Sequence, residues 1–70
     1  MYRVTYFTLN GKLIGQKTIS RGTRSAVFKA LPKGTGNILV YKVTEFDTVL
    51  TYAEYTFDLY TNKWRGGKEF

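Results

Sequence analysis

A β-hairpin is indicated by the stretch at residues 2–19, which reads YRVTYFTLNGKLIGQKTI. Its centre, Asn10-Gly11, separates two runs rich in β-branched and aromatic residues, and this is the strongest short-range signal for a hairpin. A two-residue turn would pair Phe7 with Ile14 and leave both on an otherwise polar face. The apolar face would then hold Tyr2, Val4, Tyr6, Leu13 and Ile19. The alternation predicts a sheet with one buried and one solvated face.

Lys17 falls on the apolar face in this register. A lysine that points toward the buried side is typical of an edge strand, where it discourages pairing with other chains. We therefore expect residues 12–19 to form a strand at the edge of the sheet.

One short helix is predicted over residues 24–31. Thr23 is suited to the N-cap position, and Pro32 stops the helix. Val27 and Leu31 are four positions apart, so they form an apolar stripe that can pack on the sheet. A helix of two to three turns needs such packing because it is not stable alone.

The rest of the chain reads as strands. Residues 38–46 and 49–60 are rich in β-branched and aromatic side chains, and Asp47-Thr48 separates them. A further turn leads to a short last strand through Trp64, and residues 66–70 are expected to fray.

The element order is ββαββ(β). It predicts an α+β fold: one domain over residues 1–70, with an antiparallel sheet of four or five strands and one short helix packed on one face. No repeat, low-complexity stretch or linker divides the chain.

Composition argues against an enzyme. Among the 70 residues there is no cysteine and no histidine. The chain therefore offers no disulfide, no thiolate zinc site, no cysteine nucleophile and no histidine base. Its acidic residues lack the spacing of a metal-binding loop. We expect no catalytic residue, no metal, no cofactor and no small-molecule substrate.

The sequence also gives no reason to expect a membrane partner. No apolar run reaches the length of a transmembrane helix, and the first residues lack the apolar core of a signal peptide. The hydrophobic fraction of 43% and the aromatic fraction of 17% are too high for a disordered basic tail. The expectation is a folded cytoplasmic protein.

The chain is basic, and its charge is unevenly distributed. Eleven lysine and arginine residues stand against five aspartate and glutamate residues, giving +6 at pH 7. Residues 1–37 contain seven of the basic residues and no acidic one, whereas residues 38–70 contain four basic and five acidic residues. Such asymmetry suggests that the first half faces an anionic partner. The alternative is chance placement on a solvated surface.

The start of the predicted helix combines features of a phosphate site. Arg21 and Arg24 flank Gly22, and three hydroxyl-bearing residues lie around them. The N–H groups at a helix N-terminus attract anions, and glycine lets a ligand come close to the backbone. The alternative interpretation is an ordinary loop in which Thr23 caps the helix and both arginines are solvated.

The polar face of the first hairpin is a second candidate for nucleic-acid contact. Basic residues interleaved with aromatic ones occur on sheet surfaces that bind single-stranded nucleic acid. Here Arg3 and Lys12 accompany Phe7, although Phe7 and Ile14 can equally pack under a loop or a second copy. Together with the helix start, the predicted nucleic-acid-binding residues are Arg3, Lys12, Arg21, Gly22, Arg24, Lys29 and Lys33.

The second half of the chain suggests a protein interface. Pairing of residues 38–46 with 49–57 would leave both faces of these strands apolar. One face would hold Ile38, Val40, Ala53, Tyr55 and Phe57. The helix covers one face only, and tyrosines on the other supply contact area at low entropic cost. The predicted interface residues are Tyr41, Val43, Leu50 and Tyr52.

The small size and the tyrosine and threonine content of the chain resemble those of accessory proteins of phages and mobile elements, a likeness that rests on no motif. The leading expectation is a non-enzymatic module that contacts nucleic acid or a nucleoprotein complex through its basic first half. One alternative is a protein-binding inhibitor or adaptor, encoded by a phage or mobile element and acting in the host cytoplasm. The other is a homo-oligomeric structural protein.

Overall fold

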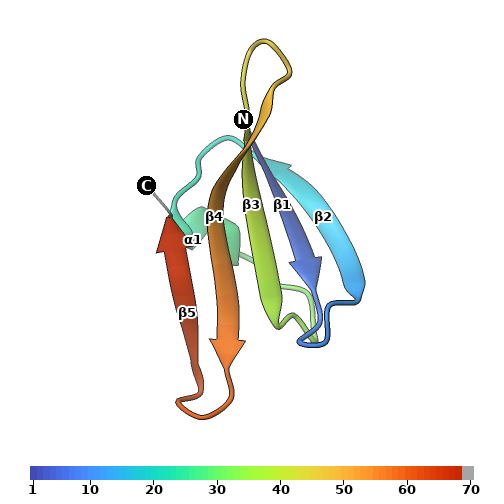
Figure 1. Cartoon of the computed structure of the whole chain (residues 1–70), viewed down its shortest axis with the longest axis vertical. Coiled ribbons are helices and arrows are strands. Elements are labelled where there is room, and N and C mark those ends of the chain that lie inside the picture. Colours follow the sequence, from blue (N-terminus) through green and yellow to red (C-terminus); the bar gives the residue numbers. More distant parts are fainter. Residues whose placement is uncertain (69–70) are drawn as a thin grey trace.

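The computed structural model describes residues 1–68, with the side chain of Lys68 left aside. Its elements are β1 (Tyr2–Phe7), β2 (Leu13–Ile19), α1 (Arg24–Phe28), β3 (Asn37–Val43), β4 (Val49–Asp58) and β5 (Lys63–Lys68). The strands form one antiparallel sheet in the order β2-β1-β3-β4-β5 (Figure 1). The predicted α+β fold, an antiparallel sheet with one short helix, is confirmed, and the sheet has five strands.

β2 lies at one edge of the sheet, as Lys17 predicts. Because β1 pairs antiparallel with both β2 and β3, those two strands run parallel to each other, and a crossover must join them. Residues 20–36 supply this crossover, which includes α1 and passes behind the sheet in Figure 1.

The first hairpin forms with a three-residue turn in place of the expected two-residue turn. The Thr8 N–H donates to the Lys12 carbonyl (2.8 Å), and the Gly11 N–H donates to the Thr8 carbonyl (3.0 Å). Gly11 has a φ of +88°, so the turn closes through the left-handed region that glycine adopts most readily.

The predicted register of this hairpin holds for the first five residues of β1 and then shifts by one residue. Phe7 pairs with Leu13, which leaves Ile14 as the extra residue of a β-bulge. The expectation that Leu13 lies on the apolar face and Ile14 on the polar one is therefore wrong. Leu13 is 63% exposed, and Ile14 packs against the core.

α1 is shorter than predicted. Thr23 is its N-cap, since its Oγ1 accepts a hydrogen bond from the N–H three residues further on (3.3 Å). The helix ends at Phe28 because Ala30 adopts a φ of +53° and the residue before Pro32 avoids the helical conformation. Leu31 still packs against the core. Within residues 1–68, no helix has the length and apolar character needed to cross a membrane.

A second β-bulge lies in β4. Val40 pairs with Ala53, but Tyr41 pairs with Thr51, which leaves Tyr52 as the extra residue. The extra residue reverses the alternation of side chains, so the part of β4 before the bulge faces the opposite way from the prediction.

Among the described residues, seven side chains are buried together in one cluster. They are Val4, Tyr6, Val27, Ile38, Val40, Ala53 and Tyr55. Six of them come from β1, β3 and β4, and they define what we call the core face of the sheet; the opposite side is the exposed face. Val27 comes from α1, and the ring centroid of its neighbour Phe28 lies 5.0 Å from that of Tyr55 and 5.1 Å from that of Trp64.

β5 continues beyond its expected end. The predicted strand ends at Trp64 and residues 66–70 are expected to fray, whereas Gly66, Gly67 and Lys68 pair with β4. Residues 69–70 lie outside the described residues.

Candidate nucleic-acid interface

Gly22 lies beneath two tyrosine rings. Tyr2 of β1 and Tyr52 at the bulge of β4 contact each other with ring centroids 4.8 Å apart. A Cβ atom on Gly22 would lie 2.8 Å from a ring carbon of each. This side of Gly22 is therefore filled by the protein itself, and is not open to a phosphate as the sequence interpretation assumes.

Gly22→Ala is expected to lower the free energy of unfolding by about 1–3 kcal/mol, because the added methyl group would collide with both rings. Chemical denaturation measures this loss. Affinity for an oligonucleotide, compared where both proteins are folded, should not change. A variant that keeps full stability and loses affinity would assign Gly22 to a ligand instead.

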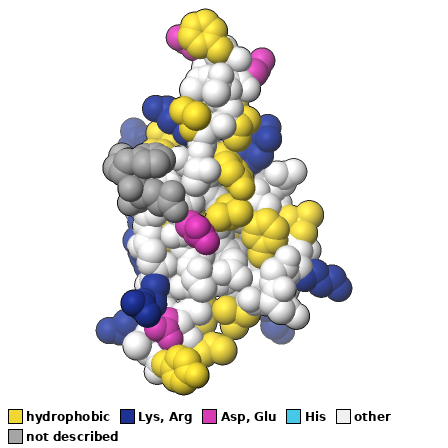
Figure 2. Space-filling model, viewed as in Figure 1, with side chains coloured by type: hydrophobic (Ala, Val, Ile, Leu, Met, Phe, Trp, Pro, Cys, Tyr) yellow, Lys and Arg dark blue, Asp and Glu magenta, His cyan; other side chains and the backbone are white. Residues whose placement is uncertain are grey.

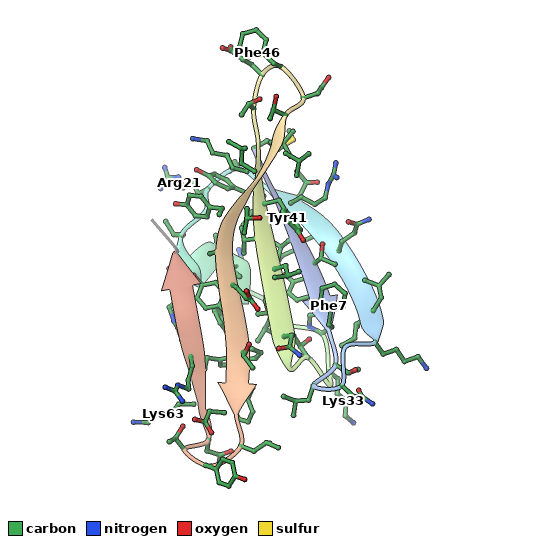
Figure 3. The ribbon with its side chains drawn as sticks, in the orientation of Figure 1. Phe7, Arg21, Lys33, Tyr41, Phe46 and Lys63 are labelled. Carbon is green, nitrogen blue, oxygen red and sulfur yellow. The ribbon has the colours of Figure 1, made fainter. Side chains whose placement is uncertain are left out.

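Arg24, the first residue of α1, extends over aromatic side chains. Its guanidinium carbon is 4.7 Å from the ring centroid of Phe28 and 5.3 Å from that of Tyr55. These cation–π contacts orient the side chain without neutralising it, and the residue stays exposed. Arg21, in the segment before the helix, is exposed as well (Figure 3).

Lys17 is joined to the segment that follows α1. Its Nζ donates a hydrogen bond to the Lys29 carbonyl (2.8 Å) and lies 5.7 Å from the ring centroid of Tyr6. Lys29 itself is exposed. Lys17 is not among the predicted nucleic-acid-binding residues, because its position beside Lys29 arises only when the crossover folds over the sheet. The one feature of the sequence that pointed to its location is that Lys17 falls on the apolar face in the register of the first hairpin.

Lys12 and Lys33 lie in neighbouring loops. Asn37 joins these loops, since its Nδ2 donates to the carbonyls of Thr8 (2.9 Å) and Leu9 (3.3 Å). Both lysines are exposed, and Lys33 is labelled in Figure 3.

Six basic residues therefore lie on β2, on α1 or in the loops that flank them. We call them the basic belt: Lys12, Lys17, Arg21, Arg24, Lys29 and Lys33. No acidic residue occurs between residues 12 and 33. The acidic side chains at positions 1–67 lie elsewhere, in the β3–β4 loop or on β4. The belt therefore carries positive charge that no carboxylate of its own segment offsets.

The exposed face carries a different set of side chains. The register places Arg3 opposite Tyr41, and Leu39 opposite Glu54. Figure 2, in which this face is toward the viewer, shows hydrophobic side chains near its middle. Arg3 lies on this face, where the register of the first hairpin predicts it, and on the opposite side of the sheet from Lys17. Phe7 is half-buried on the same face as Arg3 (Figure 3).

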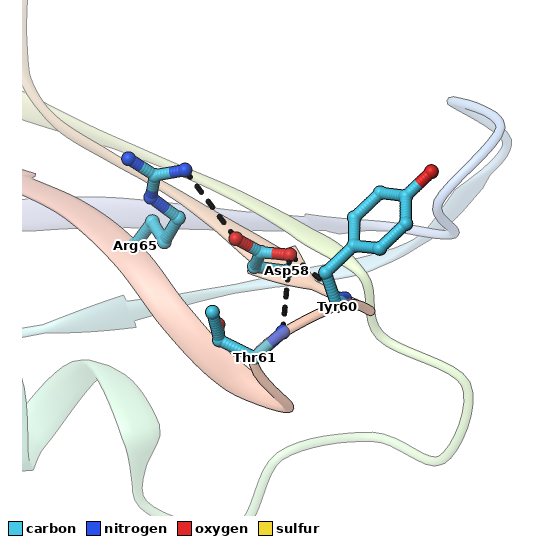
Figure 4. A network of polar contacts seen from close by, with 4 residues as sticks. All are labelled: Asp58, Tyr60, Thr61 and Arg65. Atoms are coloured by element: carbon cyan, nitrogen blue, oxygen red, sulfur yellow. Dashed lines mark hydrogen bonds and ion pairs between the residues drawn. The ribbon is translucent and has the colours of Figure 1, made fainter.

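Asp58 organises the turn between β4 and β5 (Figure 4). Its Oδ1 accepts hydrogen bonds from the N–H groups of Tyr60 (2.9 Å) and Thr61 (3.4 Å), and its Oδ2 is 3.3 Å from Nη1 of Arg65. The Tyr60 N–H above all, then the Thr61 N–H and the charge of Arg65, hold the pKa of Asp58 below its ordinary value. Asp58 is ionised at neutral pH and offsets Arg65, so this pair adds no net charge to its end of the sheet.

The four residues of the predicted protein interface are divided between the two sides of the sheet. Tyr41 and Val43 lie on the exposed face, as expected. The bulge turns Leu50 and Tyr52 to the other side, where Tyr52 packs against the core and Leu50 stays 50% exposed. The expectation that all four share one surface is wrong, because a single extra residue in β4 reverses the alternation.

The structure is a small antiparallel α+β domain in which the six cations of the basic belt lie along β2, α1 and the loops that flank them. Within residues 1–68, no three histidine, cysteine, aspartate or glutamate side chains gather into a group that can hold a metal ion. The chain matches no protein-family model, no curated protein and no solved structure.

Proposed function

We propose that the protein is a non-enzymatic module that binds nucleic acid, free or in a nucleoprotein complex, through the basic belt. In this proposal α1 packs on the core face and turns Arg24 and Lys29 toward the ligand. A cytoplasmic location, where nucleic acid is accessible, is part of the proposal. The observation that supports it is the separation of charge: the belt contains no acidic residue, whereas Glu54 accompanies Arg3 on the exposed face.

A polyanion is the kind of partner that such a surface favours. Each phosphate contact made by a lysine or arginine releases condensed counterions, so affinity grows with the number of cations that reach the backbone. The guanidinium of Arg24 is already held by Phe28 and Tyr55, so it loses less conformational freedom when it binds a phosphate. Backbone contacts of this kind carry no base specificity. The proposal is therefore one of phosphate recognition.

Lys33→Ala is expected to weaken oligonucleotide binding and to reduce the slope of log affinity against log salt by about one unit, because one phosphate contact is lost. Fluorescence anisotropy with labelled single-stranded and duplex oligonucleotides, over a series of salt concentrations, measures both quantities. Lys63→Ala is the matched control. It removes the same side chain and the same charge at the β4–β5 turn, away from the belt (Figure 3), and should leave the slope unchanged.

If Lys33→Ala and Lys63→Ala reduce the salt slope by the same amount, only the net charge of the protein matters for binding. The belt would then no longer be the site. A complete lack of salt-dependent binding would favour the second candidate function, which is protein docking through the exposed face. Phe7, Leu39 and Tyr41 support that candidate, because they lie half-buried on the neighbouring strands β1 and β3 of that face.

A further inference from the structure

The β3–β4 hairpin projects beyond the rest of the sheet and carries Phe46 at its tip (Figures 1 and 3). Phe46 is 82% exposed, and Val49 and Leu50 at the base of the hairpin are about half exposed. Single exposed apolar residues are common on protein surfaces, but an aromatic ring at the end of a projecting hairpin contributes nothing to the core. The position of Phe46 is therefore suited to contact with a partner outside the folded monomer.

The first hairpin supplies a direct comparison, because its turn has the same hydrogen bonds. The Thr44 N–H donates to the Thr48 carbonyl (2.9 Å) and the Asp47 N–H to the Thr44 carbonyl (3.0 Å), as in the turn that begins at Thr8. In both turns the fourth residue has a positive φ. The third residue is Phe46 in one turn and Asn10 in the other, an ordinary turn residue. The turn geometry therefore does not require an aromatic side chain.

The Phe46 turn is also well ordered by its own hydrogen bonds. The Oγ1 of Thr44 accepts from the N–H groups of Phe46 (3.3 Å) and Thr48 (3.1 Å). A side chain that is presented on a pre-organised loop loses little conformational entropy when it docks. Phe46 is thus held in a conformation from which it can insert into a pocket.

The charges beside Phe46 restrict what it can insert into. Glu45 and Asp47 flank it, both exposed, and neither has an ion-pair partner among residues 1–67. These carboxylates disfavour an anionic membrane surface and the phosphates of a nucleic acid. They favour an apolar pocket of a protein with arginine or lysine at its rim.

The chain itself has a mainly apolar pocket at the same end of the molecule. It has a volume of about 400 Å³ and is lined by Met1, Thr18, Ile19 and Ser20. Arg3 pairs with Thr18 in the register of β1 and β2, and Arg21 follows Ser20 in the chain, so two arginines are direct neighbours of residues that line the pocket. The N-terminal end of β1 and the tip of the β3–β4 hairpin lie toward the same end of the molecule's long axis in Figure 1.

We propose that the β3–β4 hairpin docks on a second copy of this chain, with Phe46 of each copy in the Met1–Ile19 pocket of the other. Because hairpin and pocket lie at the same end, a two-fold axis satisfies both contacts at once and the assembly closes as a dimer. Glu45 and Asp47 then approach Arg3 and Arg21 of the other copy. The proposal does not depend on nucleic-acid binding, and its test contains no nucleic acid.

Sedimentation equilibrium of the full chain from about 1 μM to 1 mM should show a monomer–dimer equilibrium. Phe46→Asn, which copies the residue at the matching position of the first turn, should raise the dissociation constant about tenfold or more. Tyr60→Asn is the matched control. It removes a fully exposed aromatic residue from the β4–β5 turn at the other end of the molecule and should leave the dimer intact.

Thr18→Trp tests the pocket from its own side, because the indole ring fills the space into which Phe46 would insert. It should also weaken the dimer, and circular dichroism checks that each variant is folded. A chain that stays monomeric at the highest concentration overturns the proposal, as does a dimer that survives Phe46→Asn. A dimer that survives Thr18→Trp overturns the assignment of the pocket.

Discussion

Ile38→Ala is expected to lower the free energy of unfolding by about 2–5 kcal/mol. Ile38 is fully buried on β3, between Tyr6 of β1 and Tyr55 of β4, so truncation leaves a cavity that these two rings cannot easily close. Small domains are stable by only about 5–15 kcal/mol in total, so the loss is a large share of the whole. Urea denaturation, analysed with a common slope, measures it.

The neighbouring residue Leu39 gives the matched control. Leu39→Ala removes a side chain of similar size from the same strand, but on the exposed face, where Leu39 is only half-buried. Its cost should be less than half that of Ile38→Ala, because less apolar area returns to water and no cavity forms. Equal losses at both positions would mean that the two faces are not buried as described.

Gly66→Ala is expected to cost roughly 2 kcal/mol or more, from two effects that add. The φ of Gly66 is +102°, a conformation that residues with a Cβ atom rarely adopt, and that atom would lie 2.2 Å from the backbone oxygen of Glu54. The substitution should therefore loosen β5 from β4. Hydrogen exchange at the amides of β5 should show this loss of protection directly, alongside a lower unfolding midpoint.

Gly15→Ala is the control for Gly66→Ala. Gly15 has no positive φ, and a Cβ atom there would meet nothing within 4 Å. The change should shift stability by less than about 1 kcal/mol, in either direction. A similar loss at both glycines would point to a general effect of alanine in this sheet rather than to the contact with Glu54.

The parts of the fold that could be predicted are those that depend on local patterns. The pairing of β1 with β2, the edge position signalled by Lys17 and the N-cap at Thr23 all follow from residue types a few positions apart. The two β-bulges could not be predicted in this way. The extra residue at Ile14 or Tyr52 alters neither the composition of the strand nor the residues that mark the turn. It nevertheless reverses the face of the sheet to which each residue between the bulge and the turn points.

The candidate site was predictable in its charge but not in its layout. The lack of acidic residues in the first half of the chain already indicates an anionic partner. The register of the first hairpin already places Arg3 and Lys17 on opposite faces, but only the path of the crossover shows that Lys17 and Lys29 meet. Gly22 has its role for the same reason, since Tyr2 and Tyr52 come to it from strands far apart in the sequence.

The strand order also has a kinetic consequence. Three of the four strand pairings join elements that are consecutive in the chain, and only β1 with β3 joins distant ones. The two halves of the sheet, β1–β2 and β3–β4–β5, can each form from local contacts. The chain entropy of closing the crossover, residues 20–36, into a loop is then concentrated in the one step that pairs β1 with β3. That crossover contains four of the six cations of the belt, so the step that completes the sheet also brings Lys29 beside Lys17.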